Sequence, residues 1–232
     1  MLNSQPIEKR RDFDDGEYLD VHSVFYTIQG EGPYCGKPAI FIRLAGCNLQ
    51  CPGCDTDYTS NRKRRDITDI SIEVKQSWMP KTQCLVVITG GEPFRQNITP
   101  LCRLLVSLHC HVQIETNGTL APSNDLPAAV TIVCSPKTGK INKDLIERVD
   151  YFKYVAKHDD ILADGLPATA LDHTAMPHLA RPPKSYNRAI YLQPMDSQIP
   201  VVNDANLLAV QKSCMEHGHT LQIQLHKIIG MA

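Results

Sequence analysis

The sequence lacks any apolar run approaching the roughly 18 residues that a membrane-spanning helix needs, and it has no excess of charge of either sign. Its 24 basic and 25 acidic residues give a formal net charge of −1, which provides no overall attraction to nucleic acid or to a membrane surface. The first residues, MLNSQPIEKRRDFDDGEY, are densely charged and lack the apolar segment of an export signal. These absences predict a cytoplasmic protein that binds neither nucleic acid nor membranes.

A second CxxC pair is also missing, although the chain has nine cysteines. In a reducing compartment, clustered thiols indicate metal binding or catalysis rather than disulfides. A structural zinc site commonly uses two CxxC-like pairs, and a thioredoxin-like pair of Cys51 and Cys54 would leave Cys47 unexplained. The other six cysteines lie among apolar residues and are predicted to be small buried hydrophobic residues: Cys35, Cys84, Cys102, Cys110, Cys134 and Cys214.

Short apolar runs alternate with helix-compatible segments along the chain. The runs cover residues 39–44, 84–89, 111–116, 130–135, 150–155, 189–194 and 220–225. Helices are predicted over 68–79, 97–110, 142–149 and 204–217, the last capped by Asn203 or Asp204. Several runs are continuous, as in parallel strands buried on both faces. The pattern predicts an α/β fold with a mainly parallel sheet in one domain over 1–232, with the proline-rich segment 157–188 as a loop excursion.

Polar or glycine-containing segments follow nearly every apolar run: AGCNLQC, TGGEP, ETNG, SPK and QPMD. Sheets of this class place their ligands at the carboxyl ends of the strands. The sequence therefore predicts one site built from these segments.

The stretch GCNLQCPGCD (46–55) places Cys47, Cys51 and Cys54 at x3 and x2 spacings. Four-iron clusters are normally held by one thiolate per iron, so three cysteines would leave the fourth iron open to an external ligand. An open coordination position is typical of a site that does chemistry. An iron–sulfur cube therefore explains the three thiols better than zinc does.

The same stretch resembles the CxxxCxxC signature of radical S-adenosylmethionine (SAM) enzymes, and TGGEP (89–93) resembles their second motif. A finer resemblance, over nearly the whole chain, is to the 7-carboxy-7-deazaguanine synthase family. It rests on VFYTIQGEGPYCGKPAIFIRLAGCNLQCPGCDT (24–56), ITGGEP, IETNGT, CSPK, YLQPMD and LQIQLHKIIG. This resemblance implies a partial (β/α) barrel of the radical SAM type, in which residues 1–37 form a segment that contacts substrate.

The resemblance implies a lyase that converts 6-carboxy-5,6,7,8-tetrahydropterin to 7-carboxy-7-deazaguanine with loss of ammonia, in queuosine and 7-deazapurine biosynthesis. SAM would chelate the open iron and yield a radical that takes one hydrogen from the pterin. The implied cofactors are a 4Fe-4S cluster, SAM and Mg²⁺. The implied partners are the pterin, an external reductant such as flavodoxin, and a second copy of the chain in a homodimer.

The resemblance also assigns site residues. The cluster ligands are Cys47, Cys51 and Cys54, and Thr56 is the magnesium ligand. The SAM-binding residues are Gly90, Gly91, Glu92, Glu115, Ser135, Pro136, Lys137, Gln193, Pro194, Met195 and Asp196. The substrate-binding residues are Ile28, Gln29, Gly30, Glu31, Arg43 and Thr89.

Several interpretations stay open. Arg43 lies in an apolar run, where a charge needs a partner, either the substrate carboxylate or an internal acidic residue. The basic run RKRR (62–65) is a solvated face or a docking site for an acidic electron donor. His226 is treated as a satisfied rim residue. Alternatives for the whole chain are a glycyl-radical-enzyme activase acting on a protein, and a non-catalytic iron–sulfur electron carrier or zinc-stabilised binding module.

Overall fold

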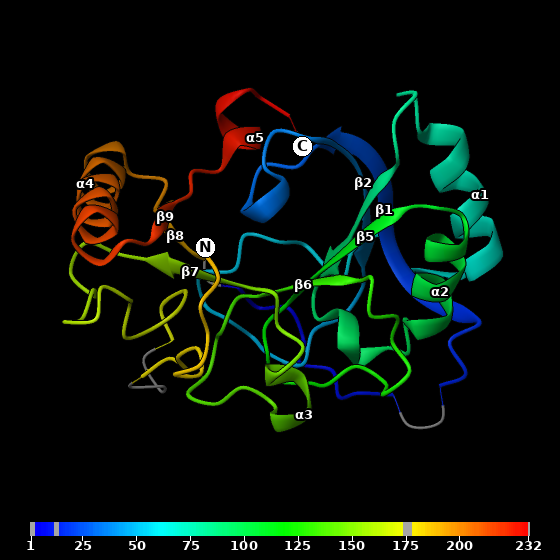
Figure 1. The fold of residues 1–232 in the computed structure, drawn as a ribbon, viewed down its shortest axis with the longest axis horizontal. Coiled ribbons are helices and arrows are strands. Elements are labelled where there is room, and N and C mark those ends of the chain that lie inside the picture. The colour runs from blue at the N-terminus through cyan, green and yellow to red at the C-terminus, as the bar shows by residue number, and fades with distance from the viewer. Residues whose placement is uncertain (1–2, 12–13, 174–177, 232) are drawn as a thin grey trace.

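A computed structural model describes residues 3–11, 14–173 and 178–231 (Figure 1). Within these residues nine strands form one sheet in the order β3-β1-β2-β4-β5-β6-β7-β8-β9. The strands are β1 (Tyr18–Ile28), β2 (Pro38–Leu44), β3 (Lys63–Asp66), β4 (Leu85–Gly90), β5 (His111–Thr116), β6 (Thr131–Cys134), β7 (Tyr151–Ala156), β8 (Ile190–Pro194) and β9 (Thr220–Leu221). From β2 to β9 neighbouring strands are parallel, whereas β1 pairs antiparallel with β2 and β3.

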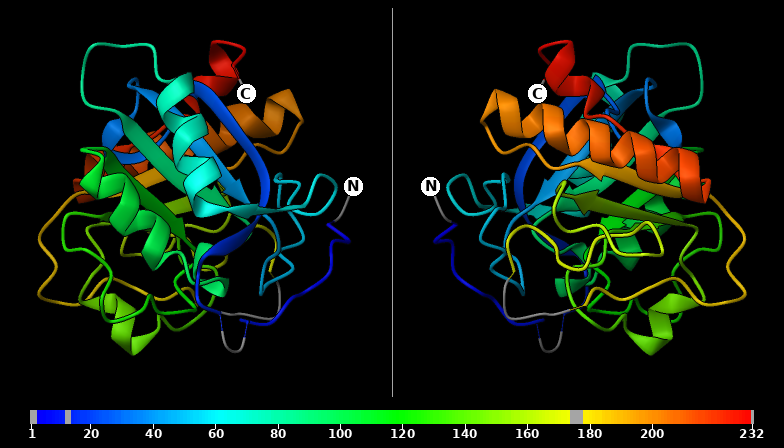
Figure 2. Two further views of the ribbon diagram at one scale, coloured as in Figure 1. Left: turned by 90° about the vertical axis from the view of Figure 1, so that its right-hand side faces the viewer. Right: turned by 90° about the vertical axis from the view of Figure 1, so that its left-hand side faces the viewer.

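The helices lie beside the strands that they connect. They are α1 (Ile67–Ser77), α2 (Thr99–Ser107), α3 (Lys143–Ile146), α4 (Pro200–His217) and α5 (Leu225–Ile228), with short 3₁₀ helices η1 (Gly32–Tyr34) and η2 (Pro93–Arg95). Figures 1 and 2 show α1 and α2 at one end of the sheet and α4 at the other, beside β8 and β9. Because β3 and β9 are the two ends of the strand order, the barrel is open. The predicted α/β fold with a mainly parallel sheet is confirmed.

The continuous apolar runs form the core, as a sheet covered on both faces requires. Ile40 and Ile42 of β2, Ile88 of β4 and Ile114 of β5 have no exposed surface. Burial of side chains of this size contributes about 1.5–3 kcal/mol each relative to an exposed position. No helix among the described residues is both long and apolar enough to cross a membrane.

Two strands of the sheet were not predicted. β1 (YLDVHSVFYTI) has only three buried side chains, at Leu19, Val21 and Thr27, and most of the others are partly buried, a pattern less obvious than a continuous apolar run. β3 is the basic sequence KRRD, which pairs with β1 at the outer edge of the sheet. Charged side chains suit an edge strand because they discourage pairing with another chain. The basic run 62–65 therefore includes most of an edge strand.

The predicted start of the helix over 204–217 and the predicted end of the strand over 220–225 are wrong. α4 begins at Pro200, after Ile199, because proline suits the first helical position. The side-chain Oδ1 of Asn203 instead accepts a hydrogen bond from the Ser197 amide, at 2.7 Å. The strand predicted over 220–225 ends at Leu221, since Gln222 turns inward and donates to the Gly30 carbonyl at 3.0 Å. α5 follows where that strand was expected to end.

The six cysteines outside the motif are mostly buried, as predicted, with one error. Cys102, Cys110, Cys134 and Cys214 are buried and Cys84 is partly buried, but Cys35 is exposed. Cys35 lies in the turn after η1, next to the exposed Gly36, and its apolar sequence neighbours belong to the strands on either side. The described residues of 157–188 contain no helix or strand. Assignment of the whole chain to one domain stays a prediction.

Candidate active site

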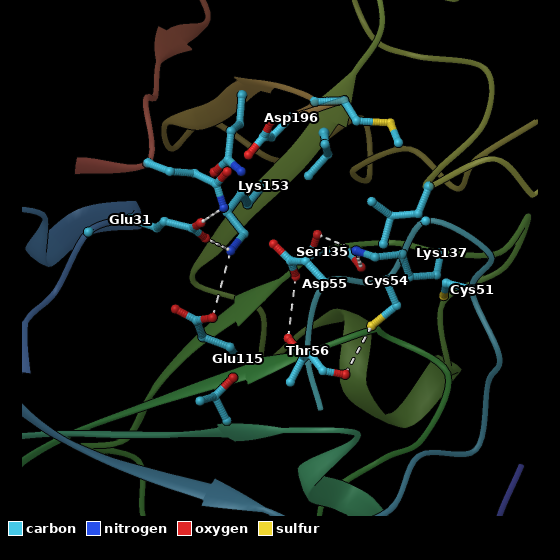
Figure 3. A pocket seen from close by; sticks show the side chains of 18 of the residues that line it. Glu31, Cys51, Cys54, Asp55, Thr56, Glu115, Ser135, Lys137, Lys153 and Asp196 are labelled. Carbon is cyan, nitrogen blue, oxygen red and sulfur yellow. Dashed lines mark hydrogen bonds and ion pairs between the residues drawn. The ribbon is translucent and has the colours of Figure 1, made fainter. Parts of the chain in front are cut away.

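A large cavity of about 1110 Å³ lies at the carboxyl ends of the parallel strands (Figure 3). Its walls include the ends of β4 at Gly90, β5 at Glu115, β7 at Val155 and β8 at Gln193. The loop with the three cysteines forms another wall. The segments that the sequence predicted to share one site therefore do so, for the reason given by the sheet topology.

Hydrogen bonds to the N-terminal segment, to η2 and to Tyr58 hold the loop that carries the three cysteines in place. The Gly46 amide donates to the Tyr58 carbonyl at 2.9 Å, and the Glu8 amide donates to the Cys47 carbonyl at 2.7 Å. The buried Arg95 donates from Nη2 to the Ala45 carbonyl at 2.9 Å. These contacts fix the loop before any ligand binds, so the thiols have a defined direction.

The thiols of Cys47, Cys51 and Cys54 all face the cavity. Burial raises the pKa of Cys47 to about 12 and that of Cys51 to about 11, and it also raises the pKa of Cys54. Buried thiols are neutral on their own and become thiolates when a cation is bound. Among the described residues no group of three His, Cys, Asp or Glu side chains surrounds a single-ion position. Three soft sulfur donors along the wall of a wide cavity fit an iron–sulfur cube.

The GGEP segment (90–93) lies in close contact with the loop that carries the three cysteines. Gly90 has a φ of +131°, and an added Cβ on Gly91 would collide with the Gly46 carbonyl and approach the Cys47 Cβ to 2.9 Å. Only glycine allows this approach. The Glu92 carboxylate is fully buried away from the cavity and accepts hydrogen bonds from the Phe94 and Asn117 amides, at 3.0 and 2.8 Å. Its side chain therefore fixes the shape of the segment.

Arg43 lies in the cavity wall on β2, in register with Thr89. Its guanidinium lies over the ring of Phe25, 5.3 Å from the centroid, and Phe25 stacks on Phe41. Its buried Nε atom has no hydrogen-bond partner among the described residues. A buried guanidinium N–H without a partner is costly, so this position favours an anionic ligand.

A second charged group faces the cavity from β7. Lys153 is 7% exposed and forms an ion pair with Glu31 and another with Glu115, whose Oε2 lies 3.7 Å from Nζ (Figure 3). Burial raises the pKa of Glu31, but the charge of Lys153 and hydrogen bonds from Lys153 and Gln224 outweigh burial and lower this pKa to about 2. Both carboxylates lie within reach of one ammonium, so the acidic side chains of this group outnumber its one basic side chain.

The C-terminal segment covers the loop that carries Glu31. The Leu225 amide donates to the Gly30 carbonyl at 3.2 Å, and the Gln224 amide nitrogen donates to Glu31 at 2.9 Å. His226 lines the cavity directly above Gly30, where an added Cβ would collide with the imidazole. Lys227 bridges Asp55 of the cysteine loop and Asp196 at the end of β8, at 3.3 and 2.9 Å.

Comparisons with known proteins identify the family. Residues 28–120 match the family described as a 4Fe-4S single cluster domain. The chain is 41% identical over 225 residues to 7-carboxy-7-deazaguanine synthase of Rhodospirillum rubrum, covering 94% of each protein. It is 40% identical over 226 residues to the enzyme of the same name from Rickettsia prowazekii, covering 94% of this chain and 90% of that protein. The crystal structure of QueE from Escherichia coli matches with a TM-score of 0.68 and 26% identity, covering 90% of this chain and 95% of that one.

The chain belongs to the 7-carboxy-7-deazaguanine synthase family. The resemblance inferred from QGEG, the cysteine motif and TGGEP is therefore confirmed. The open sheet also agrees with the fold of QueE.

The structure brings nearly all of the predicted site residues of this family member together. Three do not line the cavity: Glu92, Pro136 and Pro194. The residues that do line it are Cys47, Cys51, Cys54, Thr56, Ile28, Gln29, Gly30, Glu31, Arg43, Thr89, Gly90, Gly91, Glu115, Ser135, Lys137, Gln193, Met195 and Asp196. Their individual roles stay predictions.

Sequence reasoning missed several polar residues of the cavity, among them Lys153, His226 and Asn206. Lys153 was missed although a lysine within the apolar run DYFKYV gives the same signal as Arg43 in AIFIRL. His226 was treated as a rim residue, but it faces the cavity. Asn206 gave no signal in the sequence. It lies just after the predicted cap of its helix, Asn203 or Asp204, and its hydrogen-bond partners, His158 and Met195, belong to other segments.

Asn206 is expected to hold the end of β8 in place. It is fully buried, donates to the Met195 carbonyl at 2.8 Å and accepts from the His158 amide at 2.9 Å. The Asn206→Ala change leaves both groups without this partner, which should lower the free energy of unfolding by about 1–3 kcal/mol and weaken SAM binding. Urea unfolding and SAM titration measure the two effects. Lys212→Ala, at an exposed position of the same helix, is the control and should change stability by less than about 0.5 kcal/mol; equal effects of the two substitutions would contradict the assignment.

Proposed function

We propose that the chain is a 7-carboxy-7-deazaguanine synthase, a radical SAM lyase that converts 6-carboxy-5,6,7,8-tetrahydropterin to 7-carboxy-7-deazaguanine with loss of ammonia. The product belongs to queuosine and 7-deazapurine biosynthesis. One observation carries the proposal: three cysteine thiols open into the same cavity as Arg43, whose Nε has no hydrogen-bond partner among the described residues, and the carboxylates of Glu31 and Glu115. The membership of the family supports it.

The cavity wall near the cysteines would hold the 4Fe-4S cluster and SAM. When bound, these groups supply a carbon-centred radical that removes one hydrogen atom from the substrate. The backbone of Gly90 and Gly91 leaves room for the methionine end of SAM, since no side chain blocks it. Lys137 donates to the Ser135 carbonyl at 2.9 Å, and its charge lowers the pKa of Cys51 against the effect of burial. This lysine therefore places a positive charge beside the cysteines.

The rest of the cavity would orient the substrate between groups of opposite charge. Arg43 can bind the substrate carboxylate with two N–H groups, the geometry that guanidinium favours. Glu31, held ionised by Lys153, can accept hydrogen bonds from the N–H groups of the pterin edge. Fixing both ends leaves one orientation of the ring, and orientation is the protein's main contribution to such a reaction.

Magnesium remains part of the proposal at Thr56. The Thr56 hydroxyl donates to Asp55 at 3.4 Å on the rim of the cavity. Mg²⁺ prefers oxygen ligands and keeps several of its waters. The Thr56 hydroxyl and oxygens of the substrate would therefore be enough to hold the ion here. An ion here would neutralise the substrate carboxylate together with Arg43.

The proposal includes a cytoplasmic location, an external reductant such as flavodoxin and a homodimer. Lys63 and Arg64 are exposed on the edge strand β3, which follows the cysteine loop directly, and this supports docking of an acidic donor. Val201, Leu208 and Met215 are exposed at seven-residue spacing on α4, so they lie on one helix face that a second copy would cover.

The test is anaerobic incubation of the reconstituted protein with SAM, a reductant and 6-carboxy-tetrahydropterin. We expect 7-carboxy-7-deazaguanine by mass spectrometry without any protein partner. Zinc without sulfide in the purified protein would support a zinc-stabilised module instead. A cluster spectrum that SAM leaves unchanged would support an electron carrier. Turnover only with a partner protein would support a glycyl-radical-enzyme activase.

Arg43→Gln is expected to weaken capture of the substrate carboxylate. Hydrogen bonds to charged groups contribute about 1.5–3 kcal/mol, so kcat/KM should fall about 10- to 150-fold, mainly through KM. Steady-state kinetics with the pterin measure this, and Arg43→Lys should recover only part of the loss because lysine lacks the planar fork. Unchanged KM in Arg43→Gln would place the carboxylate elsewhere.

A further inference from the structure

Two cysteines outside the active site are neighbours at the opposite end of the sheet. Cys84 immediately precedes β4 and Cys110 immediately precedes β5. The strands pair in parallel with Leu85 opposite His111, so Cys84 and Cys110 are the adjacent pair one step earlier. The His111 amide donates to the Cys84 carbonyl at 2.7 Å, which ties the two positions together. Neighbouring strands lie about 4.8 Å apart, within the roughly 4.4–6.8 Å between Cα atoms that a disulfide spans.

The two thiols contact each other and differ in acidity. A hydrogen bond from the Cys84 side chain lowers the pKa of Cys110, with burial opposing and the Lys75 ammonium assisting. The same hydrogen bond raises the pKa of Cys84, and burial adds to it. Cys110 is therefore the better nucleophile, and Cys84 stays protonated. Thiols that take part in disulfide exchange are often paired in this way.

Exposure allows a reagent to reach the pair. Cys84 is partly exposed and Cys110 is 6% exposed. Neither lines the cavity, since both lie at the amino ends of strands whose carboxyl ends form the active site. Nothing in the proposed reaction uses them, so their contact is a separate feature of the fold.

We propose that Cys84 and Cys110 form a reversible dithiol–disulfide site that exchanges with small-molecule disulfides of the glutathione class. The Cys110 thiolate attacks one sulfur of glutathione disulfide, forming a mixed disulfide and releasing one glutathione thiolate. The Cys84 thiol then gives up its proton and attacks the Cys110 sulfur, forming the protein disulfide and releasing the second glutathione. Two protein thiols are oxidised, one glutathione disulfide is reduced to two glutathione molecules, and the two thiol protons are carried by these products.

The disulfide would join the starts of β4 and β5 and close a loop that contains Gly90, Gly91 and α2. Cross-linking restricts the unfolded chain, so the oxidised protein should resist unfolding better than the reduced protein. The active-site ends of both strands are at the other end of the sheet, so the cluster content should not change.

The experiment uses the reconstituted holoprotein under anaerobic conditions, equilibrated in buffers of increasing glutathione disulfide to glutathione ratio. Samples are quenched with acid, alkylated and digested without reduction, and the peptides are identified by mass spectrometry. We expect a linked pair of peptides containing Cys84 and Cys110, two hydrogens lighter than the separate peptides, which reverts when excess glutathione is restored. Iron and sulfide contents report the cluster independently.

The exposed Cys35 is the internal control, because a reagent that reaches the protein should form a mixed disulfide there. In Cys84→Ser, Cys110 should instead accumulate the glutathione adduct, since no second thiol can displace it. Modification of Cys35 while Cys84 and Cys110 stay free thiols at every ratio would overturn the proposal. So would a link that forms only after urea is added. Neither readout depends on turnover, so failure here is distinct from failure of the proposed enzyme activity.

Discussion

Cys51→Ala is expected to abolish formation of 7-carboxy-7-deazaguanine. Cys51 is buried in the wall of the cavity between the other two thiols of the motif. Without it, one iron of the cluster loses its only thiolate from the protein, and the site keeps two sulfur donors where a cluster with a single open position requires three. The iron and sulfide contents of the reconstituted protein should fall together, and no product should be detected.

Cys102→Ala is the matched control for this result. Cys102 is a fully buried thiol on α2 that does not line the cavity. Its loss should lower stability, as a small cavity in the core does, and leave the iron and sulfide contents and the product yield unchanged. Product formation by Cys51→Ala, or full iron and sulfide in it, would contradict the assignment of the cluster ligands.

The parts of this fold that follow from local pattern were predictable. Continuous apolar runs such as 39–44 and 84–89 became β2 and β4, because burial on both faces leaves few polar positions in the strand; the exceptions, Arg43 and Thr89, face the cavity. β1 was missed because its one buried face gives only weak alternation, and β3 was missed because an edge strand needs no apolar side chains. LQIQL (221–225) alternates as a strand does, yet Gln222 finds its partners in the backbone of Gly30 and Gly32.

The site was predictable where one segment carries a whole function, and less so where distant segments meet. Cys47, Cys51 and Cys54 lie in one loop, so their spacing alone indicated a cluster. The partners of Lys153 are 122 and 38 positions away in the sequence, at Glu31 and Glu115, and only the strand order brings them together. The role of the C-terminal segment as a cover depends likewise on contacts that no local pattern encodes.

Lys153→Met is expected to destabilise the protein and to reduce turnover strongly. Methionine matches the length of lysine but leaves Glu31 and Glu115 buried without a counter-ion. Removing one partner of a buried ion pair costs about 3–5 kcal/mol, because an uncompensated charge stays in the interior. One carboxylate should then take up a proton and stop accepting a hydrogen bond from the pterin edge, so kcat/KM should fall as well.

The pH dependence separates this electrostatic role from simple packing. Because the pKa of Glu31 is lowered from 4.5 to about 2, its contribution to stability is complete above pH 4.5 and is lost as the pH falls toward 2. The stability difference between the wild type and Lys153→Met should therefore be largest near pH 7 and shrink below pH 4.5. Urea unfolding of the full chain without cluster, followed by the fluorescence of Trp78, measures this difference. Lys153→Arg keeps the charge and should recover most of the stability, whereas a difference that stays constant with pH would show that Lys153 acts only by filling space.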